Sequence, residues 1–237
     1  MGAIKFTIDE KLLQFFSQHL PLEVFVETGT YEGDNILLAQ SYFKACFSVE
    51  INKALYRKVY KRFEQQENVF IENGDSKQLL GTIKDEVNQS SSLFWLDAHD
   101  LYSTVNPYID PASAQSPLLG ELRAIESLNE DSVILIDDAH LYLSVLPKPN
   151  SLSRWPDFQD VIQALLSMSD QHRIAVYNDT LIYYPDRLRL AFTQFSYENS
   201  VDLLKVTLDA RNYREELIKK QQDEEQAKGI LGKFKRQ

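Results

Sequence analysis

The sequence predicts a doubly wound α/β domain built on a mostly parallel sheet. Segments with strand character alternate five times with segments whose apolar residues recur at helical spacing, between residues 7 and 168. The strand segments are continuous apolar runs, which is typical of parallel strands covered by helices on both faces. No repeat recurs at the period of a solenoid, so the sequence does not describe a repeat array.

The expected elements follow each other in a regular order. The first helix is predicted over 7–20, with Thr7 as N-cap and Glu10 at the capping-box position. Strands are predicted at 23–29, 45–51, 69–76, 92–99 and 132–140. Helices are predicted at 36–43, 52–66, 77–87, 117–128 and 157–168. The run HRIAVYNDTLIYYPD predicts a hairpin that turns at Asn178 and Asp179 and adds an antiparallel edge to the sheet.

We expect residues 1–200 to form the α/β domain and residues 201–237 to form a charged helical extension. The extension has mixed charge and is predicted to be a solvated helix or a helix that contacts another subunit. The terminal helices could then join copies into a homo-oligomer. The last residues of the extension combine basic side chains with the apolar Ile230, Leu231 and Phe234, so a weak membrane contact is the alternative.

Composition narrows the class of protein. Of the 237 residues, 43% are hydrophobic and 25% are charged, as in an ordinary globular protein. The net charge of −10 disfavours a nucleic acid as the partner, because binding the phosphate backbone requires a basic surface. No signal peptide is expected and no stretch reaches the roughly 18 apolar residues of a membrane span, so we expect a cytoplasmic protein without stable membrane insertion. The single cysteine, Cys46, excludes an intramolecular disulfide.

Acidic residues stand at the carboxyl end of all five predicted strands. Such residues are unfavourable inside strands, so their repeated appearance there is not explained by strand propensity. In sheets of this kind, ligands bind outside the carboxyl ends of the strands. The groups expected at this edge are Glu27 with the loop Gly29–Gly33, Glu50, Asp75 with Ser76, Asp97 with His99, and Asp137 and Asp138 with His140.

The carboxyl end of the first predicted strand indicates the kind of ligand. Gly29 and Gly33 would let the backbone turn tightly and approach a ligand closely. Their spacing is not G-x-G-x-x-G, which disfavours a dinucleotide, and an acid at position 27 suits a cationic group better than a pyrophosphate. Glu50 is placed to take the hydroxyls of a ribose, and Asp75 with Ser76 can meet an adenine edge. A cationic group, a ribose and an adenine together describe S-adenosylmethionine (SAM).

Five motifs occur in the same order as in a known superfamily: VFVETGTYEGDN, FSVEIN, ENGDSKQLL, LFWLDAHD and VILIDDAH. Over roughly residues 20 to 185 the chain resembles the class I SAM-dependent methyltransferases, which have a Rossmann-like fold. Within them it is most similar to the small-molecule O-methyltransferases of the catechol type and of macrolide-sugar pathways. The resemblance implies a cofactor site made by Glu27, Gly29, Thr30, Tyr31 and Gly33 around the methionine, Glu50 at the ribose, Asp75 and Ser76 at the adenine, and Asp97.

The resemblance also implies a metal site, and the positions of two histidines, each two residues after a strand-end aspartate, indicate a base. Asp97, Asp137 and Asp138 occupy the positions that bind Mg²⁺ or another divalent cation in those families; the alternative is that the two adjacent aspartates only cap the next segment. His99 and His140 are the candidate general bases beside Asp97, and we favour His99 because its loop leads toward the substrate. The catechol-type enzymes carry a lysine where this chain has Asp100, which argues against a lysine-assisted deprotonation.

Two loops are expected to shape the acceptor pocket. The loop 100–116 is long for a connection, holds Tyr102 and Tyr108, and is predicted to close as a lid. The loop 141–156 is the second candidate, with aromatic residues that could wall the pocket.

The sequence therefore predicts a SAM-dependent O-methyltransferase that acts on a small hydroxylated acceptor, such as a sugar or a natural product, with a divalent cation as an optional helper. The alternative from another class is a binding protein that keeps the fold without catalysing a reaction. An NAD-dependent oxidoreductase is the third reading, and it lacks the glycine motif that it needs.

Overall fold

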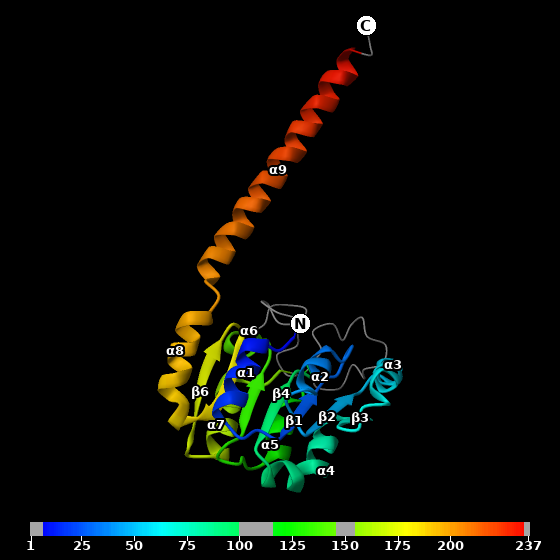
Figure 1. Ribbon diagram of the computed structural model, residues 1–237. Helices are drawn as coiled ribbons and strands as arrows, with labels where there is room; N and C mark the ends of the chain where they lie inside the picture. Colours follow the sequence, from blue (N-terminus) through cyan, green and yellow to red (C-terminus); the bar gives the residue numbers. More distant parts are fainter. Residues whose placement is uncertain (1–6, 100–115, 146–154, 235–237) are drawn as a thin grey trace. The chain divides into compact units, whose positions relative to one another are not determined.

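The computed structural model of the chain describes residues 7–99, 116–145 and 155–234 (Figure 1). The chain divides into two compact units, Met1–Ser196 and Tyr197–Gln237. The first unit carries the sheet and the second consists mainly of one long helix, so each is described separately.

The first unit is built on a seven-stranded sheet in the order β3-β2-β1-β4-β5-β7-β6. The strands are β1 (Val24–Thr28), β2 (Ala45–Glu50), β3 (Val69–Asn73), β4 (Ser92–Leu96), β5 (Val133–Ile136), β6 (His172–Tyr177) and β7 (Thr180–Pro185). The first five strands are parallel, and β7 and β6 are antiparallel to their neighbours. This confirms the predicted fold class, including the antiparallel hairpin at the edge. The strand order reverses between β1 and β4, which is where sheets of this kind bind ligands.

Helices cover both faces of the sheet (Figure 1). They are α1 (Glu10–His19), α2 (Asp34–Ala39), α3 (Lys53–Phe63), α4 (Ser76–Gln89), α5 (Leu118–Ile125), α6 (His140–Leu143), α7 (Phe158–Met168) and α8 (Arg189–Asn199). Residues of α1, α2, α3 and α8 share one hydrophobic core with every second strand residue, such as Phe25 and Trp95. Residues of α4, α5 and α7 share the other core with the alternate positions, such as Val26 and Phe94.

The structure differs from the sequence-based expectation at several element ends. Helix α1 is capped by Asp9, whose side chain accepts a hydrogen bond from the Lys11 backbone N–H at 3.1 Å, rather than by Thr7. The cap lies later because the backbone N–H of Ile8 is bound at 2.8 Å by the Asn35 side chain. The turn α6 and the helix α8 were not predicted from the sequence, although Leu188, just before α8, and Phe192 and Phe195 within it recur at helical spacing.

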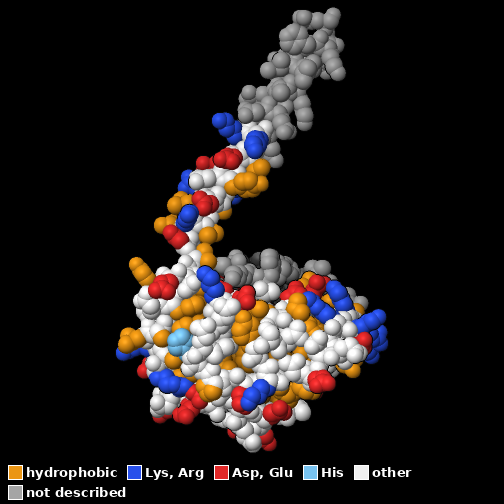
Figure 2. All heavy atoms as spheres, viewed as in Figure 1, with side chains coloured by type: hydrophobic (Ala, Val, Ile, Leu, Met, Phe, Trp, Pro, Cys, Tyr) orange, Lys and Arg blue, Asp and Glu red, His pale blue; other side chains and the backbone are white. Residues whose placement is uncertain are grey.

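Figure 2 shows basic side chains gathered over α3. Cys46 is a free thiol that is fully buried in β2. In the second unit, α9 (Leu203–Phe234) is a single long helix. Among the described residues, no helix is long and apolar enough to span a membrane.

Candidate functional site

Glu27, at the end of β1, lies beneath the carboxyl edge of the sheet rather than on it. Its side chain has no exposed surface, and its two carboxyl oxygens accept hydrogen bonds from the Ser48 hydroxyl at 2.6 Å and the Asn35 amide at 2.9 Å. Burial raises the pKa of Glu27 to about 8, although these two hydrogen bonds oppose the shift. The arrangement ties β1 to β2 and α2, and the side chain offers no exposed surface to a ligand.

Gly29 and Gly33 both adopt left-handed backbone conformations, with φ of 84° and 79°. A Cβ atom on Gly29 would lie 2.6 Å from the carbonyl oxygen of Asp97, and one on Gly33 would lie 2.8 Å from the Phe63 ring. The predicted tight turn is therefore present. The close approach that requires glycine is made to the loop after β4 and to α3, which are protein groups.

Glu50 holds the same loop from the end of β2. One of its oxygens accepts a hydrogen bond from the Tyr31 backbone N–H at 2.9 Å, and the other accepts one from Asn52 at 2.7 Å. Burial raises the pKa of Glu50, and the two backbone N–H groups oppose that shift. A carboxylate has about four acceptor positions, so each oxygen can still accept a hydroxyl.

The end of β3 is organised by Asp75 and Ser76. Asp75 caps α4 by accepting from the Lys77 backbone N–H at 2.9 Å, and it forms an ion pair with the Lys77 amine at 3.2 Å. Ser76 is buried and hydrogen-bonded to Glu121 of α5, which also bonds Thr28. Burial raises the pKa of Glu121 to about 7 despite these two hydrogen bonds. The sequence analysis missed Glu121, because nothing in α5 marks this acid as buried.

The ends of β4 and β5 bring Asp97, His99 and Asp138 together. The His99 ring lies between the two acids, with Nε2 at 2.9 Å from Asp138 Oδ2 and Nδ1 at 3.4 Å from Asp97 Oδ1. One ligand atom from each residue lies within 4.8 Å of the other two. Burial lowers the pKa of His99, but the hydrogen bond to Asp138 and the charges of both acids outweigh it, so the net shift is upward.

Asp137 and its neighbour Asp138 differ in the direction of their pKa shifts, which is upward for Asp137 and downward for Asp138. Burial, helped by the negative charges of Asp97 and Asp138, raises the pKa of Asp137 to about 7. Among the described residues, Asp137 is not part of a group with metal-ligand spacing, whereas Asp97 and Asp138 are. The structure thus brings together two of the three predicted ligands and places His99 beside them.

His140 begins the short α6 and is held by Asp179, from the turn between β6 and β7. Its Nδ1 lies 2.7 Å from Asp179 Oδ2, and its backbone N–H donates to Asp179 Oδ1 at 2.9 Å. The Ala139 N–H donates to the Asp179 carbonyl at 2.7 Å. Half of the His140 side chain, 51%, remains exposed. This arrangement fixes the ring orientation and leaves the far edge of the ring toward solvent.

Aromatic side chains stand next to these groups. The Trp155 indole N–H donates to the Leu141 carbonyl at 2.8 Å, and its ring stacks on Tyr142 and meets His99 edge-on at 5.8 Å between centroids. Trp155 is thus one wall beside His99, as the pocket hypothesis for the loop 141–156 requires. The predicted lid, with Asp100, Tyr102 and Tyr108, lies outside the described residues.

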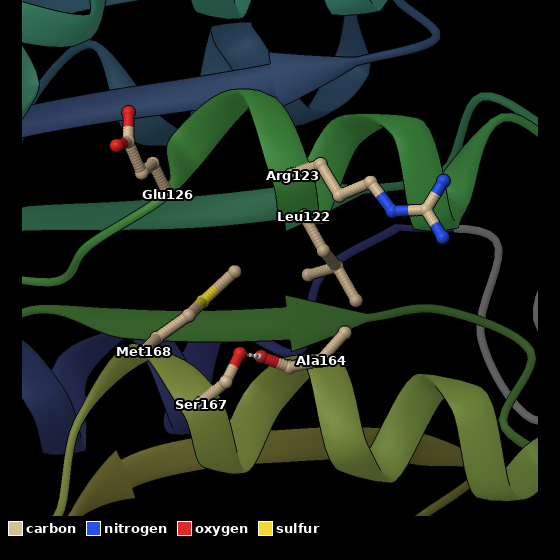
Figure 3. Close-up of a pocket in the computed structure, with 6 residues that line it drawn as sticks. All are labelled: Leu122, Arg123, Glu126, Ala164, Ser167 and Met168. Carbon is tan, nitrogen blue, oxygen red and sulfur yellow. Dashed lines mark hydrogen bonds between the residues drawn. The ribbon is translucent and has the colours of Figure 1, made fainter.

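A hollow between α5 and α7 lies over the face of the sheet that these two helices cover (Figure 3). It is lined by Leu122, Arg123, Glu126, Ala164, Ser167 and Met168. The Ser167 hydroxyl donates a hydrogen bond to the Ala164 carbonyl at 2.7 Å. None of the lining residues belongs to the candidate site.

Comparison with known proteins tests the fold. No family model matches the sequence, and no curated protein matches it. The solved structure of an inferred caffeoyl-CoA O-methyltransferase from Staphylococcus aureus matches with a TM-score of 0.53 at 14% identity, covering 77% of this chain and 84% of that one. An inferred O-methyltransferase from Klebsiella pneumoniae gives a TM-score of 0.48 at 13% identity, covering 74% and 79%.

The chain has the fold of the class I SAM-dependent methyltransferases. The first of these comparisons covers 77% of this chain, and the mostly parallel sheet agrees with the Rossmann-like fold that the sequence motifs predict. In a class I methyltransferase fold the carboxyl edge is the ligand side, and Glu50, Ser76, Asp97, Asp138 and His140 all lie along that edge.

Proposed function

We propose that the chain is a SAM-dependent methyltransferase that methylates a hydroxyl group of a small acceptor. The observation that supports this most is the placement of Glu50 and the Gly29 loop beside Asp97, where the strand order reverses. The acceptor class rests on the resemblance to small-molecule O-methyltransferases and on the acids and histidines at the ends of β4 and β5.

The residues of the edge fit the three parts of the cofactor. Glu50 has acceptor positions left for ribose hydroxyls, and Ser76 and Asp75 stand at the next strand end for the adenine. Tyr31, 65% exposed and on the glycine loop, lies at the position assigned to the methionine part. When bound, SAM supplies an electrophilic methyl group on a sulfonium. Glu27, in contrast, acts on the cofactor only through the loop that it supports.

The acceptor hydroxyl must lose its proton, and two histidines at this edge of the sheet are candidates to accept it. His140 is oriented by Asp179 and keeps an exposed ring edge, which is the arrangement of a general base. His99 is enclosed between Asp97 and Asp138, and its proton is stabilised by two carboxylates. We therefore assign proton acceptance to His140. His99 positions the two acids in this assignment, which reverses the preference drawn from the sequence.

A divalent cation is the second means of activating the hydroxyl. Asp97, His99 and Asp138 would hold it, since their ligand atoms already lie within 4.8 Å of one another. The buried Nδ1 of His99 makes no hydrogen bond and only the 3.4 Å ion pair with Asp97, which fits a site that takes a cation. A bound cation would lower the pKa of the acceptor hydroxyl.

A methyl-transfer assay separates this function from its alternatives. The purified chain is incubated with methyl-labelled SAM and a panel of hydroxylated acceptors that includes sugars and catechols. Transfer of label to an acceptor hydroxyl supports the proposal. Label on an acceptor nitrogen or carbon would reject O-methylation, and binding of SAM without transfer to any acceptor would favour the non-catalytic binding protein.

A further inference from the structure

Helix α9 exposes apolar side chains, some of them in one row along the helix and others, such as Leu204 and Leu208, outside it. In the part of α9 whose side chains are described, Val206, Tyr213 and Leu217 are 50%, 64% and 41% exposed. Figure 2 shows hydrophobic side chains along this part of the helix, between charged ones. The helix begins at a cap, because Asp202 accepts a hydrogen bond from the Lys205 backbone N–H at 3.0 Å.

Helices in water gain most of their stability by packing an apolar face, not from helix propensity. A helix from Leu203 to Phe234 with an exposed apolar row therefore gains stability when that row packs against a partner.

The spacing of the row identifies the kind of partner. Apolar residues recur at alternating intervals of three and four, which is the heptad pattern of a left-handed coiled coil. The positions of this seam read Leu203, Val206, Ala210, Tyr213, Leu217, Lys220, Glu224, Ala227, Leu231 and Phe234 in the sequence. Only Lys220 and Glu224 interrupt it. Such charged layers weaken a seam but restrict its register.

The charges beside the seam distinguish the two possible directions of a partner helix. The flanking positions on one side hold Asp209 and Glu216, and on the other side they hold Thr207 and Arg214. In a parallel pair, each flanking position meets the opposite side of the partner, so Asp209 faces Arg214 of the other copy. In an antiparallel pair, each flanking position meets the same side of the partner helix, so acidic residues would face acidic residues. The sequence repeats the acid-then-base order at positions 223 and 228.

We propose that α9 forms a parallel, in-register, two-stranded coiled coil with α9 of a second copy of this chain. The seam is Val206, Ala210, Tyr213 and Leu217 with its continuation in the sequence, and Asp209 pairs with Arg214 across it. The proposal does not depend on the enzymatic function. It deepens the expectation of a homo-oligomer by stating which residues meet and in which direction.

Adjacent residues provide matched variants for the first test. Leu217 lies in the seam, whereas Ile218 is next to it, comparably exposed at 45%, and outside it. Sedimentation equilibrium of the full chain should give twice the monomer mass of 27.4 kDa. Leu217→Asp should raise the dimer dissociation constant by about tenfold or more, and Ile218→Asp should change it by about twofold or less. A monomer at all concentrations, a trimer, or equal effects of the two variants would overturn the proposal.

A second test determines the direction. Ala210→Cys places a thiol in the seam, and Leu208→Cys places one on the outer side of the same turn. Mild oxidation should link two copies through position 210 and not through 208. Asp209→Arg should weaken the dimer, and the double variant Asp209→Arg/Arg214→Asp should restore it. Absence of a link through position 210 or of this restoration would reject the parallel arrangement.

Discussion

Asp179 holds His140 by two hydrogen bonds, one to the imidazole Nδ1 at 2.7 Å and one to the backbone N–H at 2.9 Å. The two residues come from different elements, the hairpin turn and the start of α6. The carboxylate therefore fixes both the position and the tautomer of the ring, so that the other nitrogen is free to accept a proton.

We predict that Asp179→Asn lowers kcat by about tenfold to a hundredfold without changing the affinity for S-adenosylhomocysteine (SAH). Asparagine tolerates the left-handed φ of 70° at this position, so the turn should survive. Its amide N–H would face Nδ1 and impose the wrong tautomer. Asp186→Asn, at an exposed ion pair with Arg173, is the control. An unchanged kcat would remove His140 from the role of base.

Substitution of Gly29 by alanine should destabilise the fold far more than the same substitution of Gly74. Gly29→Ala forces a Cβ to 2.6 Å from the Asp97 carbonyl in a backbone with φ of 84°. We expect a loss of about 2 kcal/mol or more in the free energy of unfolding. A Cβ on Gly74 meets nothing within 4 Å, so Gly74→Ala should cost about 0.5 kcal/mol or less. Urea unfolding measures both values, and similar losses would contradict the close approach at Gly29.

The buried acid Glu27 should make stability depend on pH. Its pKa is raised from the ordinary 4.5 to about 8 by burial. Between these values the folded chain binds a proton that the unfolded chain releases, so the free energy of unfolding falls as pH rises, by about 1.4 kcal/mol per unit. Glu27→Gln should reduce this slope by about 1.4 kcal/mol per unit between pH 5 and pH 8, while Glu121 and Asp137, whose pKa values are raised to about 7, keep their own contributions. Glu72→Gln, at an exposed site, should leave the slope unchanged. The same slope in Glu27→Gln and wild type would show that Glu27 is not the group responsible.

Metal binding should distinguish Asp138 from Asp137. Calorimetric titration with Mn²⁺ alone should give binding that Asp138→Asn abolishes, because Asp138 belongs to the group with ligand spacing. Asp137→Asn should retain it. Excess EDTA should slow methyl transfer, and Mg²⁺ or Mn²⁺ should restore it. Full transfer in EDTA would leave His140 as the only means of activation.

Much of the fold could be predicted from the sequence because its signals are local. Continuous apolar runs such as the one that ends at Glu27 identify parallel strands, and the turn at Asn178 and Asp179 identifies the hairpin. Acids at strand ends could be placed on one edge of the sheet, because all parallel strands end on the same side.

The details of the site depend on contacts between distant residues, which the sequence does not reveal. Glu27 looked like a ligand for a cation, yet its side chain is fully buried and hydrogen-bonded to Ser48 and Asn35 from other elements. The role of Asp179 follows only from the pairing of β7 with β5, which brings the hairpin turn to the carboxyl edge beside His140. Strand order and register therefore decided which polar residues meet.

Binding of SAH to the wild-type chain and to Glu50→Ala, measured by calorimetry, tests the central claim most directly. Glu72→Ala, in the neighbouring strand and exposed, serves as the matched control. We predict one site in the wild type, unchanged affinity in the control, and at least about tenfold weaker binding in Glu50→Ala, since hydrogen bonds to a charged group contribute about 1.5–3 kcal/mol. A wild-type chain that does not bind SAH, or a Glu50→Ala chain that binds it with wild-type affinity, would contradict the proposed cofactor site.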